Sequence, residues 1–206
     1  MGLYSRYVLP RIIDCAMRYE EASRLRAEVI PAAQGAVLEV GIGSGLNLPF
    51  YTSAVTKLYG IDSSEELLAM ARARSARAAF PVELLHQSAE RIPLADRSVD
   101  TVVVTWSLCS IPDPSGALRE MRRVLKEDGK FIFIEHGLSP DPRVRSWQKR
   151  LTPIWRRFAG GCHLDREMDD LIRAAGFSIG ELRTSYIPGP RPATYTYVGV
   201  GRRTTL

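Results

Sequence analysis

Short apolar runs rich in β-branched residues alternate with amphipathic stretches along most of the chain. Apolar runs of this length predict buried strands, and the amphipathic stretches between them predict helices that connect parallel neighbours. This alternation indicates an α/β fold in which helices cover both faces of one sheet. The last two runs are separated by a Pro-Gly-Pro link, which allows them to pair antiparallel. The predicted strands are residues 36–40, 55–61, 82–85, 99–106, 130–135, 178–186 and 194–200.

Capping residues and apolar spacing place the helices. Ser63 followed by Glu66 forms a capping box, which predicts the start of a helix after the second strand. Residues 115–125 carry apolar side chains at helical spacing, and Asp128-Gly129 then predicts a turn into the next strand. A last helix is predicted over residues 165–175.

Two segments lie outside this regular alternation. Residues 4–30 have a helical pattern, so residues 1–35 are predicted to form a helical cap on a domain that spans residues 36–206. Residues 143–158 carry six Lys and Arg side chains, no acid, and two tryptophans among apolar residues at three- and four-residue steps. This pattern predicts a basic amphipathic helix that is kinked at Pro153.

The positive charge of the chain is concentrated in this basic segment. The net charge is +5 and the isoelectric point about 9.3, so without these six charges the chain is close to neutral. Such an excess favours an anionic partner without identifying it. Three roles stay open for residues 143–163: a lid over a ligand site, a contact with an anionic membrane surface, or a helix packed on the sheet through its apolar stripe.

The composition is that of an ordinary globular protein. A length of 206 residues favours one domain, and 45% apolar with 25% charged residues excludes a disordered or collagen-like chain. No apolar run is long enough for a membrane span and no signal-peptide pattern is present, so we expect a cytoplasmic protein, with peripheral membrane contact as an open alternative. The three cysteines are far apart in the sequence and form no C-x-x-C, so neither a disulfide framework nor a structural zinc site is expected.

The motif with the clearest chemistry is a glycine-rich loop at the end of the first strand. Its pattern is E-x-G-x-G-x-G, running from Glu39 to Gly45. Glycines allow a ligand to approach the main chain, and ligands of open parallel sheets bind at the carboxyl ends of the strands. Asp62 ends the second strand, where a carboxylate can accept hydrogen bonds from both hydroxyls of a ribose. The dinucleotide fingerprint G-x-G-x-x-G places its third glycine one residue later, which disfavours a nicotinamide-dependent oxidoreductase.

These motifs resemble the first two motifs of class I S-adenosylmethionine-dependent methyltransferases. Residues 86–94, 98–104 and 118–130 resemble, in order, the family's later motifs, so the resemblance covers residues 36–136. It implies a Rossmann-like, doubly wound, seven-stranded, mostly parallel sheet with an antiparallel last strand, and S-adenosylmethionine as the cofactor. The cofactor-binding residues that it implies are Glu39, Gly41, Ile42, Gly43, Asn47, Asp62, Ser63, Ser88, Ala89, Glu90, Thr105 and Ser107.

The resemblance also assigns parts of the cofactor to these residues. It implies that Glu39 holds the methionine amine, directly or through water, and that Asp62 binds the ribose. At the adenine end this chain has Ser88 where the family commonly has an aspartate, and a hydroxyl makes a weaker hydrogen bond than an ionised group. Ala89 is expected to contact the adenine ring through its backbone.

Methyl transfer from a sulfonium needs in-line positioning and, for a weak nucleophile, removal of a proton. No metal and no covalent intermediate is expected. The candidate catalytic bases are His136, which ends the fifth strand, and His163. His86 ends the third strand near the adenine end, where it is a poorer candidate.

Two further segments narrow the acceptor. One segment is Glu135-His136 followed by the basic segment, and the other is residues 161–167. Both resemble the corresponding segments of phospholipid, quinone and thiol methyltransferases of the type 11 group. The resemblance implies methyl transfer to a small-molecule or lipid-like acceptor. The alternatives are a non-catalytic S-adenosylmethionine-binding protein and a nucleic-acid methyltransferase. The chain has no N/D-P-P-Y-like tetrapeptide, which disfavours a nucleic-acid substrate, and the oligomeric state stays open.

Overall fold

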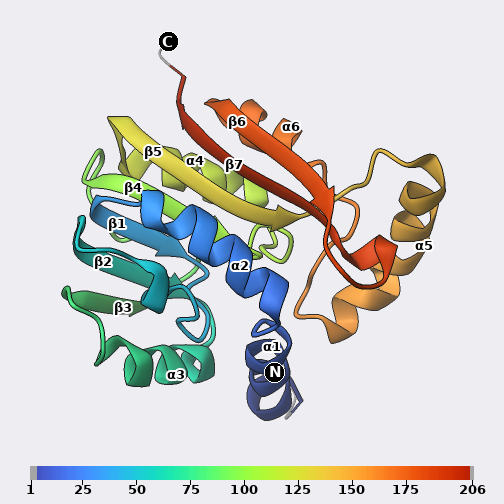
Figure 1. The fold of residues 1–206 in the computed structure, drawn as a ribbon, viewed down its shortest axis with the longest axis horizontal. Coiled ribbons are helices and arrows are strands. Elements are labelled where there is room, and N and C mark those ends of the chain that lie inside the picture. The colour runs from blue at the N-terminus through green and yellow to red at the C-terminus, as the bar shows by residue number, and fades with distance from the viewer. Residues whose placement is uncertain (1–3, 205–206) are drawn as a thin grey trace.

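The computed structural model describes residues 4–204, in which seven strands form one sheet with the order β3-β2-β1-β4-β5-β7-β6 (Figure 1). The strands are β1 (Gly35–Val40), β2 (Val55–Asp62), β3 (Val82–His86), β4 (Val99–Thr105), β5 (Leu125–His136), β6 (Phe177–Tyr186) and β7 (Tyr195–Arg203). The first five strands pair in parallel, whereas β7 lies antiparallel between β5 and β6. The predicted fold class, with its antiparallel last strand, is confirmed.

Helices cover the sheet on both sides. Figure 1 shows α2 crossing one face, α4 and α6 behind the other, and α5 set apart beside the start of β7. The α-helices are α1 (Leu9–Ala16), α2 (Glu20–Val29), α3 (Glu65–Ser75), α4 (Pro114–Val124), α5 (Pro142–Phe158) and α6 (Met168–Ala174). Short π- or 3-10-helical turns are Tyr4–Val8, Ile30–Ala32, Leu48–Phe50 and Arg191–Ala193. The boundary between the predicted segments 1–35 and 36–206 stays a prediction, and their terminal residues 1–3 and 205–206 lie outside the described ones.

Each face of the sheet carries its own apolar core. Side chains alternate along a strand, so Val102 and Val104 of β4 pack in one core and Val103 in the other. The first core receives Leu118 and Met121 from α4. The second core contains Val29, Ile30, Val37, Leu58 and Ile132. The continuous apolar runs in the sequence follow from this burial on both sides.

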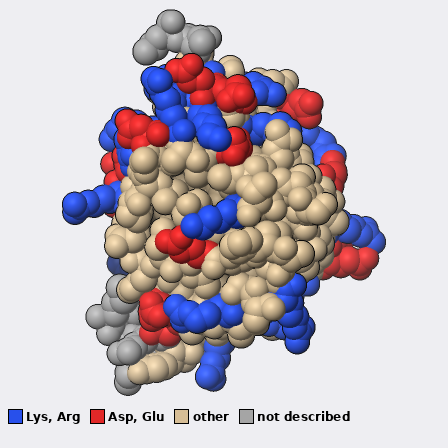
Figure 2. Space-filling view, turned by 90° about the vertical axis from the view of Figure 1, so that its left-hand side faces the viewer, with Lys and Arg blue, Asp and Glu red and all other residues tan. Residues whose placement is uncertain are grey.

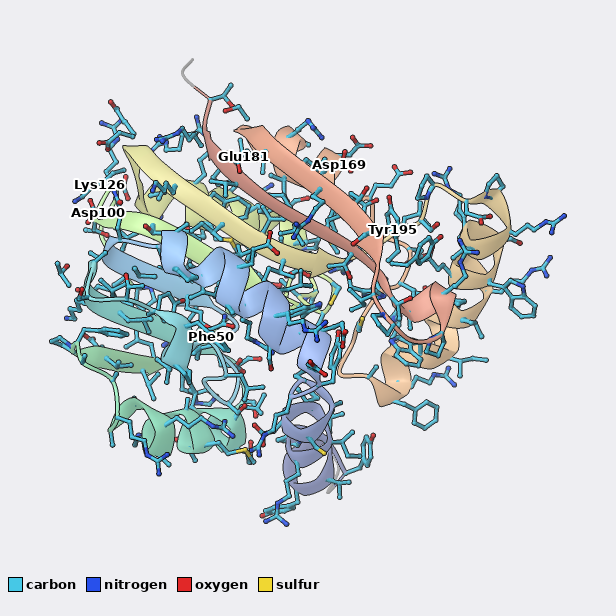
Figure 3. The ribbon with its side chains drawn as sticks, in the orientation of Figure 1. Phe50, Asp100, Lys126, Asp169, Glu181 and Tyr195 are labelled. Carbon is cyan, nitrogen blue, oxygen red and sulfur yellow. The ribbon has the colours of Figure 1, made fainter. Side chains whose placement is uncertain are left out.

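A polar contact joins the amino ends of three strands. Asp100 of β4 accepts hydrogen bonds from Lys126 Nζ at 2.6 Å and from the backbone N–H of Ala36 at 2.8 Å. Figure 3 shows Asp100 and Lys126 side by side at this edge. The opposite edge, where the parallel strands end, holds the glycine-rich loop.

Some local boundaries differ from the sequence prediction. The predicted turn at Asp128-Gly129 lies within β5. Leu125 and Lys130 both pair with β4, and the residues between them bulge away from β4. The cap of α3 is Ser64 rather than Ser63, since the Ser64 hydroxyl accepts the hydrogen bond from the N–H of Leu67.

Candidate functional site

A cavity of about 830 Å³ lies at the carboxyl ends of β1, β2 and β4, a size typical of small-molecule sites. Helix α1 and residues 159–160, which follow α5, contribute to its wall. Among the predicted cofactor residues, all but Glu90 line this cavity. They are Glu39, Gly41, Ile42, Gly43, Asn47, Asp62, Ser63, Ser88, Ala89, Thr105 and Ser107.

The glycine-rich loop has a backbone that only glycine adopts easily. Gly41, Gly43 and Gly45 have φ angles of +69°, +55° and +81°. A Cβ on Gly41 would lie 2.0 Å from Oγ of Ser107, whose hydroxyl donates a hydrogen bond to the Gly41 carbonyl. The loop therefore approaches the end of β4 without intervening side chains and leaves its main chain open to the cavity.

A buried carboxyl belongs to the part of the cavity wall formed by Glu39, Asn47 and Thr105, which we call the cavity floor. Glu39 is 1% exposed and accepts hydrogen bonds from Asn47 Nδ2 and from the Tyr51 hydroxyl, each at 2.8 Å. Asn47 Nδ2 also donates to the hydroxyl of Thr105 at 3.0 Å. Burial raises the pKa of Glu39 to about 7, although both hydrogen bonds act in the opposite direction. A positive group bound beside it would favour the ionised form.

Arg26 connects this floor to helix α2. Its Nε donates to Oδ1 of Asn47 at 3.0 Å, and its Nη1 donates to the carbonyl of Met17 at 2.8 Å. The guanidinium carbon lies 4.9 Å from the ring centroid of Trp106. Arg26 lines the cavity and is only 3% exposed. Sequence reasoning missed it because an arginine in an amphipathic helix reads as a solvent-facing residue.

Asp62, the predicted ribose-binding residue, ends β2 and lines the cavity. Its carboxylate accepts hydrogen bonds from the N–H of Gly43 at 2.9 Å and of Ser64 at 2.8 Å. Burial raises the pKa of Asp62, and these backbone hydrogen bonds oppose the rise. The carboxylate thus joins the glycine-rich loop to the start of α3.

Helix α1 is held against the glycine-rich loop by Asp14. The Asp14 carboxylate accepts hydrogen bonds from the Ser44 hydroxyl at 2.6 Å and from Arg74 at 2.9 Å, and it also pairs with Arg18. Burial raises the pKa of Asp14, but these three partners outweigh it and lower the pKa below its usual value. The sequence offered no signal for this contact, because its members come from three separate segments.

The loop after β3 presents two of the predicted adenine contacts. Ser88 and Ala89 line the cavity. Glu90, a predicted cofactor residue, instead accepts a hydrogen bond from the N–H of Asp113 at 2.8 Å and ties this loop to the cap of α4.

The loop after β4, which contributes Trp106 and Ser107 to the cavity wall, is organised by a second buried carboxyl. Glu135 is fully buried and accepts hydrogen bonds from the N–H groups of Ser107, Leu108 and Cys109 at 2.7, 2.9 and 3.3 Å. Burial raises its pKa to about 7, against the effect of these three donors. Trp106 within this loop has a φ of +49°. Such a conformation is uncommon for a bulky residue, so Glu135 holds a strained backbone in place.

Neither candidate base lines the cavity. His136 is 7% exposed, with Nδ1 3.5 Å from Sγ of Cys162. The His163 ring lies 3.6 Å from Asp165, and burial together with nearby arginines lowers its pKa. The histidine that does line the cavity is His86, whose Nε2 lies 3.0 Å from the carbonyl of Ser63.

Helix α5 turns its large apolar side chains toward solvent. Trp147, Ile154 and Phe158 are 55%, 61% and 63% exposed, while Gln148 and Thr152 are buried on the inward side. Packing of the apolar stripe on the sheet, one of the three alternatives, is therefore wrong. Figure 2 shows the face that lies on the left in Figure 1, far from α5, and on it positive and negative side chains are intermixed. Helix α5 differs from this face because it contains no acidic residue. Within residues 4–204, no helix combines the length and apolarity that crossing a membrane requires.

Comparison with known proteins finds relatives of this chain. A family model described as "Methyltransferase domain" matches residues 38–133. Human thiol S-methyltransferase TMT1A is 33% identical over 85% of this chain and 75% of its own length. Rat thiol S-methyltransferase TMT1B is 34% identical, and the match spans 64% of its length. Phosphatidylethanolamine N-methyltransferase of Cereibacter sphaeroides is 37% identical over 57% of this chain and 58% of that enzyme.

Solved structures share the fold at lower sequence identity. YcgJ of Bacillus subtilis superposes with a TM-score of 0.71 at 17% identity, covering 91% of this chain and all of YcgJ. The [4+2]-cyclase SpnF also reaches 0.71, at 20% identity, over 90% of this chain and 82% of SpnF. Because one fold serves different reactions, these likenesses establish architecture only.

Proposed function

This chain belongs to the S-adenosylmethionine-dependent methyltransferase family, and we propose that it transfers a methyl group to a small-molecule or lipid-like acceptor by in-line displacement. The observation that carries the proposal is the convergence of Glu39, the open glycine loop and Asp62 on one cavity. S-adenosylmethionine, the cofactor of this family, supplies an electrophilic methyl group when bound.

The cavity residues suit the parts of that cofactor. The buried Glu39 carboxyl, with a pKa near 7, would gain a partner in the amino group of the methionine part. Asp62 would accept hydrogen bonds from the ribose hydroxyls. Ser88 and the backbone of Ala89 would contact the adenine, which leaves Thr105 and Ser107 beside the reacting centre. Positioning of this kind can lower a barrier by roughly 7–11 kcal/mol.

The relatives favour a thiol or a lipid amine as the acceptor. Two relatives are named thiol S-methyltransferases and one a phosphatidylethanolamine N-methyltransferase. The cavity wall is compatible with a lipophilic acceptor, because α1 contributes Leu9 and Ile13 to it. A role of His136 or His163 as the base would require residues 159–167 to move, since neither ring reaches the cavity.

We further propose that residues 1–35 act as a cap and residues 143–163 as a lid that contacts an anionic membrane surface. Exposed apolar side chains of α5 lie on a helix with six basic residues, and the Tyr4 hydroxyl donates to the Phe158 carbonyl at 3.1 Å. Val8 and Ile12, which follow Tyr4 in the sequence, are also exposed apolar residues. Amphipathic basic surfaces of this kind bind anionic lipid headgroups.

The direct test is an acceptor panel with methyl-labelled S-adenosylmethionine. Alkyl thiols, phosphatidylethanolamine vesicles, quinols and short nucleic acids are incubated with the purified chain, and mass spectrometry identifies the labelled product. We expect label on a thiol or lipid amine, and loss of the label with Asp62→Ala. Cofactor binding without labelling of any acceptor would favour a non-catalytic S-adenosylmethionine-binding protein. Labelled nucleic acid would favour a nucleic-acid methyltransferase.

A further inference from the structure

Three side chains with metal-binding chemistry meet beside the cavity. Cys109 follows β4, His136 ends β5, and Cys162 follows α5. One potential ligand atom from each lies within 4.8 Å of the others. Cys109 is 3% and His136 7% exposed, whereas Cys162 is half-buried. The cysteines are far apart in the sequence, so only the fold brings them together.

One distance in the cluster is close to that between ligands of a tetrahedral zinc site, and the other ligand pairs lie within 4.8 Å. Zn–S bonds of about 2.3 Å and Zn–N bonds of about 2.05 Å place neighbouring ligand atoms about 3.6–3.8 Å apart. Sγ of Cys162 lies 3.5 Å from Nδ1 of His136. Thiolate and imidazole are the ligands that Zn²⁺ prefers among protein side chains. The cluster therefore needs little movement to bind such an ion.

The histidine ring has no strong partner in the protein. Nε2 of His136 is buried without a hydrogen bond from any residue within 4–204, and the neighbours of Nδ1 are the sulfur atoms of Cys162 and Cys109. Buried polar atoms are rarely left in this state, and an unexplained one points to an absent ion or water. A metal ion bound to Nδ1 would give that nitrogen a strong partner, and Nε2 would then carry the ring proton and donate it to a water.

Charge also favours a divalent ion. Two thiolates and one divalent cation form a neutral unit, which limits the cost of burying it. The Arg166 guanidinium donates to the carbonyls of Leu108 and Ile111 next to the cluster, and the Glu135 carboxyl precedes His136. These two side chains carry opposite charges, so the surroundings are close to neutral when both are ionised.

We propose that Cys109, His136 and Cys162 bind one Zn²⁺ ion with an open fourth position. Three protein ligands and one open position are typical of zinc sites that bind an external ligand. Ser110 and Gly160, close in sequence to the two cysteines, line the cavity, so the site borders its acceptor end. The open position takes water or an external thiolate; the thiolate part rests on the proposed function. In this arrangement His136 is a metal ligand rather than the base.

Cobalt titration tests the site without any activity measurement. The chain is stripped with a chelator, kept reduced, and titrated with Co²⁺. We expect one equivalent to bind, with thiolate-to-cobalt charge-transfer absorption and the intense visible bands of a tetrahedral site, and Zn²⁺ to displace it. Cys162→Ser and His136→Asn should weaken binding at least tenfold. Cys15→Ser is the matched control, because Cys15 is exposed on α1.

Three results would overturn the proposal. They are no charge-transfer absorption in the reduced wild-type chain, unchanged affinity in Cys162→Ser, and equal weakening in Cys15→Ser. Circular dichroism of each variant shows that a loss of binding is not a loss of folding. If the unreduced chain has a mass two hydrogens lower and the reduced chain binds no metal, Cys109 and Cys162 are a disulfide pair instead. Addition of a small thiol to the cobalt form should shift its spectrum; an unshifted spectrum removes only the external-thiolate part.

Discussion

Arg26 donates a hydrogen bond from Nε to Oδ1 of Asn47 at 3.0 Å. Asn47 in turn donates from Nδ2 to Glu39, so a residue of α2 orients the carboxyl at the cavity floor. Arg26 also donates to the carbonyl of Met17, which lies between α1 and α2. The position of the N-terminal helices is thereby coupled to the cofactor-binding side chains.

Arg26→Ala should weaken binding of S-adenosylhomocysteine by roughly tenfold or more, because hydrogen bonds to a charged group contribute about 1.5–3 kcal/mol. Titration calorimetry measures the change. Arg24→Ala is the matched control, since Arg24 lies on the same helix and pairs with Glu20 and Glu21 at the surface. Equal effects of the two substitutions would show that Arg26 does not organise the site.

Asp62→Ala should reduce the affinity for S-adenosylhomocysteine by at least about tenfold, through loss of the acceptors for the ribose hydroxyls. Asp62→Asn keeps one acceptor oxygen and should lose less. Glu83→Ala serves as the control, because Glu83 pairs with Lys57 at the exposed edge of the sheet. Calorimetric affinity unchanged in Asp62→Ala would remove the ribose assignment.

Stability should depend on pH through Glu39, whose pKa rises from 4.5 to about 7 on burial. Between these values the native state holds a proton that the unfolded chain has released, so raising the pH lowers the free energy of unfolding. The contribution of Glu39 across this window is about 3 kcal/mol.

Urea unfolding of wild type and Glu39→Gln at about pH 5 and about pH 8 isolates this effect, because Glu135 titrates in both proteins. The wild type should lose more stability than the variant as the pH rises. Parallel pH profiles would mean that Glu39 has no raised pKa.

Replacement of Ile154 and Phe158 by serine should lower the affinity of the chain for anionic vesicles at least tenfold. Each exposed apolar side chain contributes about 1.5–3 kcal/mol when it enters the lipid. Cosedimentation with vesicles containing phosphatidylglycerol measures this. Leu182→Ser on β6 is the control, because Leu182 is also exposed but lies outside the basic segment. Undiminished binding of the double variant would remove the membrane contact.

The sequence predicted the features that depend on local patterns. Central strands such as β4 were visible because burial on both faces favours continuous apolar runs such as Val102–Val104. The glycine loop was visible because its positive φ angles need that residue. The first residue of a helix can depend on one hydrogen bond, and for this reason the cap of α3 was predicted at Ser63 instead of Ser64.

The contacts that complete the cavity could not be predicted in this way. Asp14, Arg26 and Tyr51 reach the site from segments whose own patterns indicate only helix or loop. The meeting of Cys109 with Cys162 depends on how the loop after α5 returns to the sheet. Each is a long-range contact between polar groups, which leaves no periodic signal in the sequence.

The place of β7 has a consequence for synthesis on the ribosome. β6 emerges first, yet its neighbour in the sheet is β7, which follows it along the chain. Until residues 195–203 have left the exit tunnel, β6 has no strand to pair with and one edge of β5 stays open. Open edges recruit strands of other chains, so nascent or prematurely terminated polypeptides of this protein should depend on chaperones to avoid aggregation.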